Sequence, residues 1–508
     1  MHHRKHIFFG LILLLGLAEM SLWSCGKKVE EGEALAKTYC ASCHVLPSPA
    51  LLPKNVWQLS TLPYMGILMG IEDEIVNLPA PLKDYAILRP STQMISKEDY
   101  EKIKAYYIDQ APETLAEPAY APLPELQGLF SAEDVSLEIT NGTFPNMTSI
   151  AIDAASQQIL AGDQSNRIIW QLDSKGNLIQ KITNQNALTH IEKTGLGKNQ
   201  YFFTYIGTTT QANPEVNGYT DLVDLSKGTY TVLKSVMKGL NRPIYLSAQN
   251  LDAEVGDELI LSEFGFKEGG LSVWKKEAKG NYQKTILNPQ TGATRTIVRD
   301  FNQDGRLDMA SLFAQGDERV ILYLNEGGLH FKEKILQRFP SIYGTSSFDL
   351  ADMDGDGDLD LLCTAGDNAD FSTILKPYHG IYVYQNTGDF TYKPWQFFPQ
   401  NGATKAIAAD FDGDGDQDIA SIALFPDVAK RPLEGFMYLE NQGKTFTQKT
   451  LPIHHLGRWS VMDAGDVDGD GDIDLVLGSH AVAKFPAGGF DPAWKQAKGL
   501  LILRNTHK

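Results

Sequence analysis

The stretch Asp352–Asp360 reads DMDGDGDLD, and similar stretches recur at Asp300–Asp308, Asp410–Asp418 and Asp466–Asp474. The copies begin at residues 300, 352, 410 and 466, which are intervals of 52, 58 and 56 residues. A weaker copy begins at Asn250. Self-similarity at a period of this length indicates consecutive units of one supersecondary structure.

Each copy lies between short apolar runs typical of β-strands, such as FDLAD before and LDLLCTA after the copy at residue 352. With two further runs, each unit supplies four strands, which is one blade of a β-propeller. Residues 125–508 accommodate seven units of about 55 residues, with six or eight as the alternatives. We expect residues 134–139 to close the ring as the outer strand of the last blade, because closure removes exposed sheet edges. The repeats resemble the FG-GAP/VCBS type of integrin-like propellers.

The pattern D-x-D-x-D-G-x-x-D places acidic side chains at positions 1, 3, 5 and 9 around a glycine turn. Hard oxygen ligands in this arrangement, with a backbone carbonyl at position 7, suit Ca²⁺ better than Mg²⁺. A solvated acidic turn is the alternative, but carboxylates packed this densely repel one another unless a cation is present. We expect three to four calcium ions, with weaker binding where Asn302 replaces an aspartate, and none at residue 250. The predicted ligands are Asp300, Asn302, Asp304, Asp308, Asp352, Asp354, Asp356, Asp360, Asp410, Asp412, Asp414, Asp418, Asp466, Asp468, Asp470 and Asp474.

The N-terminal segment has the pattern of a signal peptide. Residues 2–6 (HHRKH) are basic, and residues 7–17 (IFFGLILLLGL) form an apolar run too short for a permanent membrane helix. The following LWSCG (residues 22–26) resembles a bacterial lipobox, in which Cys25 is acylated after residues 1–24 are removed. This resemblance implies an extracytoplasmic, lipid-anchored protein on the periplasmic or cell-surface side. An ordinary signal peptide with an incidental cysteine is the alternative.

The sequence Cys40-Ala-Ser-Cys43-His44 is a C-x-x-C-H motif, which predicts covalent c-type haem attachment. Its thiols bind the two vinyl groups of one porphyrin, and the histidine binds the iron. A zinc site would need a second ligand pair, and no further cysteine occurs before Cys363, which we expect to be buried. With predicted helices before the motif and after Ser96, residues 25–112 resemble a class I cytochrome c domain, which is small and all-α.

The second axial ligand is predicted to be a methionine. After His44 the next histidine is His190, far beyond this domain, so ligation by two of its own histidines is ruled out. A thioether ligand would raise the reduction potential of the haem. Met65 is favoured because the stretch from Trp57 to Gly66 resembles that of small fused cytochrome domains. Met94 and Met69 remain alternatives, as does a five-coordinate iron.

Composition and linker sequence complete the domain organisation. Residues 113–124 contain three prolines, at 118, 122 and 124, which predicts an extended linker. The chain has 45 basic and 63 acidic residues, a net charge of −18, which argues against nucleic acid as a partner. The hydrophobic content of 43% is ample for packed cores.

These features predict an electron-transfer protein that exchanges electrons with a redox partner protein, while its propeller binds a protein or glycan ligand. One alternative is a propeller that acts as a dehydrogenase with the haem as its electron acceptor. For that alternative, Arg242, Arg295, Lys405 and Arg458 could hold an anionic substrate. We expect them instead to be turn residues that balance the acidic loops. Another alternative is adhesion or glycan binding with an accessory haem.

Overall fold

The structure is a computed structural model that describes residues 29–118, 120–139, 143–278, 280–367, 372–481 and 489–507. The predicted signal peptide (residues 1–24) and Cys25 lie outside the described residues. Two units make up the chain: Met1–Glu117 with Asp370–Ser372, and Pro118–Ala369 with Thr373–Lys508. Within the described ranges, no helix is both long and apolar enough to cross a membrane.

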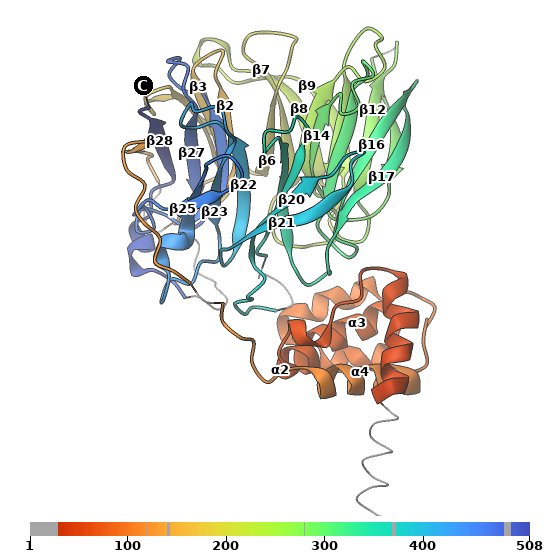
Figure 1. Ribbon diagram of the computed structural model, residues 1–508. Helices are drawn as coiled ribbons and strands as arrows, with labels where there is room; N and C mark the ends of the chain where they lie inside the picture. The colour runs from red at the N-terminus through yellow and green to blue at the C-terminus, as the bar shows by residue number, and fades with distance from the viewer. Residues whose placement is uncertain are drawn as a thin grey trace, which may run out of the picture. The chain divides into compact units, whose positions relative to one another are not determined.

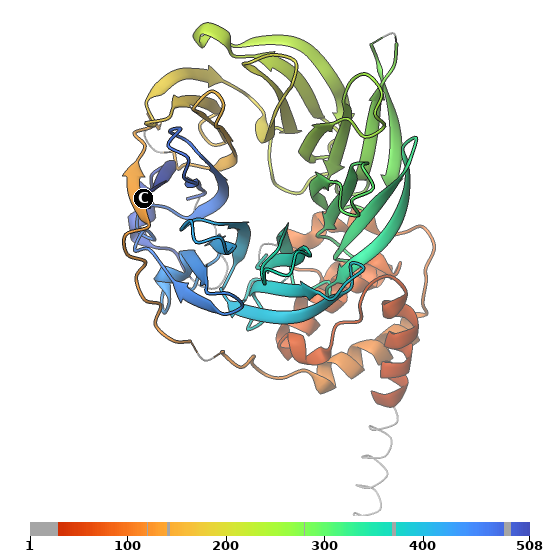
Figure 2. The same cartoon turned by 45° about the horizontal axis from the view of Figure 1, so that its top comes forward.

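The described residues of the second unit form seven four-stranded antiparallel sheets around a common axis, as Figures 1 and 2 show. This confirms the predicted seven-bladed β-propeller. Six sheets follow chain order: β2 (Met147–Asp153), β3 (Gln158–Asp163), β4 (Ile168–Asp173) and β5 (Leu178–Thr183); β6 (Ala187–Lys193), β7 (Gln200–Gly207), β8 (Gly218–Asp224) and β9 (Thr231–Leu240); β10 (Pro243–Gln249), β11 (Glu258–Glu263), β12 (Gly270–Lys276) and β13 (Tyr282–Asn288); β14 (Ala293–Arg299), β15 (Asp308–Phe313), β16 (Arg319–Gly327) and β17 (His330–Arg338); β18 (Thr345–Ala351), β19 (Asp360–Ala365), β20 (Gly380–Asn386) and β21 (Tyr392–Pro399); β22 (Ala403–Ala409), β23 (Asp418–Ala423), β24 (Phe436–Asn441) and β25 (Phe446–Lys449). The seventh sheet has the order β1 (Phe130–Asp134), β28 (Leu500–Asn505), β27 (Asp474–Ser479) and β26 (Trp459–Gly465).

The second strand of each of five blades is buried along its whole length. These strands are β11, β15, β19, β23 and β27. Neighbouring blades cover both faces of such a strand, which is why its sequence after the first residue is mostly apolar. Cys363, in the middle of β19, is 1% exposed and packs with Leu312, Phe348 and Leu361, so the prediction that it is buried is confirmed.

Strand β1 closes the ring by pairing with β28, from Phe130 opposite Asn505 to Asp134 opposite Leu501. The prediction that residues 134–139 form this strand is therefore wrong by four residues at its start. The Phe130 ring packs edge-on against the rings of Phe411 and Tyr438, and these contacts set the position of the strand. After Asp134 the chain leaves the sheet.

The first unit is helical. Residues 29–39 form a helix, and the elements that follow are η1 (Cys40–Ser42), η2 (Pro49–Leu51), α2 (Lys54–Val56), η3 (Trp57–Thr61), α3 (Leu62–Leu68), η4 (Glu72–Asn77), η5 (Ala80–Leu88) and α4 (Lys97–Gln110). Short 3₁₀ segments also occur in the propeller as η6 (Ser226–Gly228), η7 (Pro432–Gly435) and η8 (Pro492–Gln496).

Helix α4 begins where the sequence predicts, because the Ser96 side chain accepts a hydrogen bond of 3.1 Å from the Asp99 amide. The helix over residues 29–39 crosses α4 at Gly32. A Cβ atom at this glycine would lie 2.3 Å from the Lys102 carbonyl oxygen, so a larger residue would separate the two helices. The helix before the C-x-x-C-H motif therefore packs directly against the helix that ends the unit.

Candidate functional sites

The C-x-x-C-H motif forms one tight turn. Cys40 starts the 3₁₀ segment η1, and the Cys43 amide donates a hydrogen bond of 3.4 Å to the Cys40 carbonyl oxygen. The Ser42 hydroxyl closes the turn by donating to the Tyr39 carbonyl at 2.6 Å. Burial and the nearby Cys43 thiol raise the pKa of Cys40 to about 11. Five consecutive residues in a tight turn thus carry the two thiols and the imidazole of His44.

The imidazole of His44 is oriented by its own backbone. Its Nδ1 atom lies 2.9 Å from the Val45 carbonyl oxygen, so the Nδ1 hydrogen is donated there and the neutral ring has its lone pair on Nε2. Histidines that bind metals are oriented in this way, with the second ring nitrogen bound to a carbonyl or carboxylate. The donor set of this turn, two thiols and an imidazole with Nε2 available, fits covalent haem attachment.

Aromatic residues fix the chain just after the motif. The Tyr107 hydroxyl, on α4, donates to the Pro47 carbonyl at 2.9 Å. Trp57 donates from Nε1 to the Pro49 carbonyl at 2.8 Å, and its ring centroid lies 4.5 Å from that of Tyr107. The segment after His44 is therefore attached both to the closing helix and to the start of η3.

The three candidate methionines lie on two segments. Met65 lies within α3 and is half-buried, whereas Met69, just after the same helix, is buried. Met94 lies before α4 and is 50% exposed, and its amide donates to the Met69 carbonyl at 2.9 Å. The sequence prediction of Met65 as the axial ligand stays a prediction, with Met94 and Met69 as alternatives.

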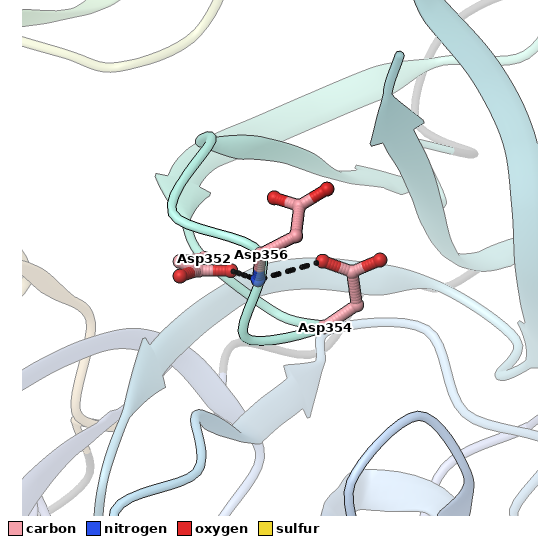
Figure 3. Close-up of side chains that lie close together, drawn as sticks. All are labelled: Asp352, Asp354 and Asp356. Carbon is pink, nitrogen blue, oxygen red and sulfur yellow. Dashed lines mark hydrogen bonds between the residues drawn. The ribbon is translucent and has the colours of Figure 1, made fainter. Parts of the chain in front are cut away.

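The acidic loops bring carboxylates together in three of the four predicted sites. The clusters are Asp352, Asp354 and Asp356; Asp410, Asp412 and Asp414; and Asp466, Asp468 and Asp474. In each cluster, one oxygen from every residue lies within 4.8 Å of the others. Figure 3 shows the first cluster, in which the carboxylates surround the Asp356 amide. Two clusters thus combine positions 1, 3 and 5 of the motif and the third combines positions 1, 3 and 9, so each contains three of the four predicted acidic ligands and could hold a metal ion.

Backbone amides shape each loop around the residue at position 1. The amide of Gly357 donates to Asp352 Oδ2 at 2.9 Å, and Gly305, Gly415 and Gly471 make the equivalent bond in their loops at 2.8–3.1 Å. The φ angle of these four glycines is +85° to +99°, which explains the invariant glycine at position 6 of the pattern.

The acidic residue at position 9 joins the loop to the sheet by accepting hydrogen bonds from both. Asp360 accepts one hydrogen bond from the Met353 amide at 3.0 Å and another from the Asn386 amide, at the end of β20, at 2.8 Å. Burial, partly offset by these bonds, raises the pKa of Asp360 to about 6. Asp308, Asp418 and Asp474 occupy the same position, and even the weak copy uses Glu258 to accept from the Leu251 amide at 2.9 Å. Position 9 thus has a structural function in addition to its predicted function as a ligand.

Among the described residues, basic side chains pair with the acidic groups of four of the five loops. In the loop that begins at Asp300, Arg306 forms an ion pair and a hydrogen bond with Asp304. In the weak copy, Lys275 donates to Asp252 at 2.5 Å and to Glu254 at 2.7 Å. These two loops are the ones that lack a complete set of aspartates. Two complete loops have similar pairs: Lys444 lies 3.5 Å from Asp354, and Arg504 lies 3.4 Å from Asp468 and 3.0 Å from Asp474. Basic side chains therefore occur at both incomplete and complete loops.

Each of the last four blades has an asparagine at the end of its third strand, which the sequence analysis did not single out. These residues are Asn325, Asn386, Asn441 and Asn505, and each is at most 5% exposed. The Asn441 side chain donates a hydrogen bond of 2.9 Å to the Met353 carbonyl, which lies in the loop of the preceding blade. Asn325 and Asn505 make the equivalent bonds at 2.8 and 2.7 Å. The sequence does contain a sign of these residues: an asparagine recurs two positions before a glycine, as in NEG, NTG and NQG.

The basic residues considered for an anionic substrate occupy two kinds of position. Arg295 and Lys405 lie within the inner strands β14 and β22, so the prediction that they are turn residues is wrong. The Arg295 guanidinium lies 3.8 Å from the carboxylate of Asp349 on β18. Lys405 donates a hydrogen bond of 2.6 Å to the Met462 carbonyl. Burial lowers the pKa of Lys405, and the carboxylate of Asp463 partly offsets this effect. Acidic side chains of neighbouring inner strands therefore already face these two cations.

Arg242 and Arg458 precede the inner strands β10 and β26, and both are buried. Arg242 donates two hydrogen bonds, one of 2.8 Å to the Gly265 carbonyl and one of 2.9 Å to the Thr210 carbonyl. Arg458 donates from Nε to the Leu424 carbonyl at 2.5 Å and packs over the Phe425 ring. These guanidinium groups attach loops to the blades.

Comparison with known proteins agrees with the repeat pattern. Residues 300–363 match the model of the FG-GAP-like repeat. The chain is similar to a structure described as "Structure of Dos1 propeller", with 11% identity over 77% of this chain and 88% of that chain and a TM-score of 0.43. It is also similar to a protein from Lactobacillus plantarum, with 12% identity over 61% of this chain and 87% of that chain and a TM-score of 0.42. No curated protein matches the sequence. The chain thus carries FG-GAP-like repeat sequence in a seven-bladed β-propeller.

Proposed function

We propose that the protein is an extracytoplasmic electron-transfer protein, with a c-type haem in its helical unit and a propeller that binds a partner or ligand. The observation that carries this proposal is the turn on which Cys40, Cys43 and His44 meet, with the His44 Nδ1 atom 2.9 Å from a backbone carbonyl. The two thiols would hold the haem covalently, and His44 Nε2 would bind its iron. When bound, the haem supplies reversible one-electron transfer.

The packing of the helical unit supports this assignment. The close crossing at Gly32 joins the helix before the motif to α4, as the resemblance to class I cytochrome c implies. Met65 is the proposed second iron ligand. Four large apolar side chains of this unit, Leu59, Val76, Ile87 and Met94, are at least half exposed. Apolar surface of this kind suits a large planar cofactor or a partner protein.

Calcium is proposed at the three loops whose carboxylates meet, those that begin at Asp352, Asp410 and Asp466. The loop that begins at Asp300 is left out because its acidic side chains, all of them among the described residues, do not form such a cluster: Asn302 replaces an aspartate, and Arg306 pairs with Asp304. The ions would have a structural function, since each loop joins the two innermost strands of its blade. Cys25 would anchor the protein to a membrane through lipid, and the redox partner would be a protein.

Absorption spectroscopy tests the proposal directly. The full chain is produced in a bacterial host that attaches c-type haem, and the purified protein is reduced with dithionite. We expect a Soret band, sharp visible bands and a haem signal that persists on a denaturing gel. The double substitution Cys40→Ala and Cys43→Ala should abolish the persistent signal, whereas Cys363→Ala, a change of the same kind in the propeller, should retain it. Wild-type protein without haem absorption would disprove the electron-transfer function.

A further inference from the structure

A groove of about 380 Å³ lies between two neighbouring blades, on the outer part of the propeller. One wall comes from the end of β17 and the residues that follow it, including Gln337 and Phe339. The other wall comes from Tyr382 and Tyr384 of β20 and from Gln396 and Phe397 of β21. The dimensions are those of a small-ligand site rather than of a packing defect, because ligand pockets are typically about 300–1,000 Å³.

Aromatic rings form the floor of this groove. The Tyr382 ring lies 4.6 Å from that of Phe397 and is stacked on those of Tyr343 and Tyr384, at 6.0 and 6.2 Å between centroids. Phe397 is 38% exposed, so part of its side chain faces solvent. The Tyr382 hydroxyl donates 2.5 Å to the Tyr378 carbonyl, which holds the ring in place. The floor is therefore a rigid aromatic platform that remains open to solvent.

The platform is specific to this blade. Tyr382 lies four residues before the strand-end asparagine Asn386, and it pairs with the third residue after the position-9 aspartate. The same register position in the other three blades with this asparagine is occupied by Ile321, Met437 and Leu501. Those three side chains are at most 1% exposed, whereas Tyr382 is half-buried. In this blade the position therefore contains an aromatic ring that packs on the core and is still partly open to solvent.

Apart from the aromatic residues, the polar side chains on the walls of the groove are one guanidinium and two amides. Arg338 donates hydrogen bonds of 3.0 and 2.6 Å to the two carboxylate oxygens of Asp317, which also pairs with Arg319. Gln337 and Gln396 add neutral amides to the lining. A ligand with many hydroxyl groups would find planar hydrogen-bond donors and acceptors beside the aromatic faces.

We propose that this groove binds a neutral oligosaccharide, with the C–H face of a pyranose ring on Tyr382 and Phe397 and its hydroxyl groups toward Gln337, Gln396 and Arg338. The proposal rests on the ligand-binding function proposed above for the propeller and does not depend on the haem. A proline-rich peptide would also stack on aromatic rings. It presents mainly carbonyl acceptors, however, and would leave the amide oxygens of the two glutamines without donors.

Binding of defined probes by the full-length protein tests this proposal. A glycan array of neutral oligosaccharides and immobilised poly-L-proline are each presented to the wild type and to the variants Phe397→Ala and Tyr382→Leu. The second variant restores the aliphatic residue of the sibling blade, so it should fold. The control is Ile286→Ala, which removes an even more exposed apolar side chain (59% exposed) from the outer strand of another blade.

We expect the wild type and Ile286→Ala to bind the same neutral glycans and both groove variants to bind them about tenfold more weakly. Absence of neutral-glycan binding by the wild type, or equal affinity in Phe397→Ala, would overturn the proposal. Binding of poly-L-proline alone, lost in Phe397→Ala, would identify a peptide groove instead. Haem absorption is recorded on the same preparations: glycan binding without haem would contradict electron transfer alone, and haem without glycan binding would contradict this inference alone.

Discussion

Asn441 donates a hydrogen bond of 2.9 Å from Nδ2 to the carbonyl oxygen of Met353, which belongs to the loop of the preceding blade. The same amide group also donates to the Gln417 carbonyl in its own loop at 3.1 Å. One buried side chain therefore joins two acidic loops. Asn325 and Asn505 make the same connections, so the loop at residue 250 is joined to the loop at 300, and the loops at 352, 410 and 466 are joined in series.

Replacement of Asn441 by alanine should lower the free energy of unfolding by about 1–3 kcal/mol, because two buried carbonyl oxygens lose their donor. Urea unfolding followed by fluorescence measures this change. Gln442→Ala, an exposed neighbour, should change it by less than about 0.5 kcal/mol. Equal stability of the two variants would show that the link between loops carries no energy.

Calcium should stabilise the propeller at three sites. We expect native mass spectrometry to find three ions per chain and calorimetry to find a lower melting temperature in EGTA. One site saturated at a hundred times its Kd contributes about 2.7 kcal/mol. Asp412→Asn should remove one ion, whereas Asp304→Asn should leave all three. A chelator without effect on the melting temperature would contradict the calcium assignment.

The loop that begins at Asp300 should gain an ion when its own cation is replaced. The double substitution Asn302→Asp and Arg306→Asp gives this loop the aspartates that its three siblings have at positions 3 and 7. We expect the stoichiometry to rise from three to four. Asn302→Asp alone should leave it at three, because Arg306 still pairs with Asp304. Four ions in the wild type would show that the arginine does not exclude a metal.

His379 should make the propeller less stable in mild acid. It is 1% exposed, and burial, with a smaller contribution from the Lys376 charge, holds its pKa well below the ordinary value of 6.5. The unfolded chain therefore binds a proton below pH 6.5 that the folded chain does not bind. This contribution to stability is full above pH 6.5 and falls by up to about 1.4 kcal/mol for each pH unit below it.

Comparing His379→Gln with the wild type separates the contribution of His379 to the pH dependence of stability from the contributions of other titrating groups. The difference in unfolding free energy between the two proteins should shrink as the pH falls from 7 to 5. The exposed Gln442, which does not titrate, serves as the control: Gln442→Ala should give a constant difference. A constant difference for His379→Gln as well would mean that this histidine titrates normally in the folded protein.

Met65→Ala should lower the reduction potential of the haem, because loss of a thioether ligand removes its stabilisation of the reduced iron. The sulfur-to-iron charge-transfer band of the oxidised protein should disappear in the same variant. Met94→Ala and Met69→Ala should retain both properties. If Met94→Ala is the variant that loses them, the iron ligand lies next to α4 instead.

The propeller could be predicted from the sequence because the acidic loops recur once per blade at nearly constant spacing. The closing strand could not, since it lies outside the repeats. Residues 134–139 alternate between apolar and polar like a strand, but the Phe130 contacts decide which segment pairs with β28. For the site, the aspartates were identifiable from their spacing. The counter-charge from Arg306 and the loop link through Asn441 depend on contacts between residues that only the folded chain brings together.

Strand β1 pairs with β28, and the Thr506 hydroxyl donates 3.0 Å to the carbonyl of Gly128, 378 residues earlier. The two halves of this junction are therefore separated along the chain by the six other blades. Those six blades can form in the order of their synthesis, but the seventh has to wait for Leu500–Asn505, so the ring closes only after every other blade has been made.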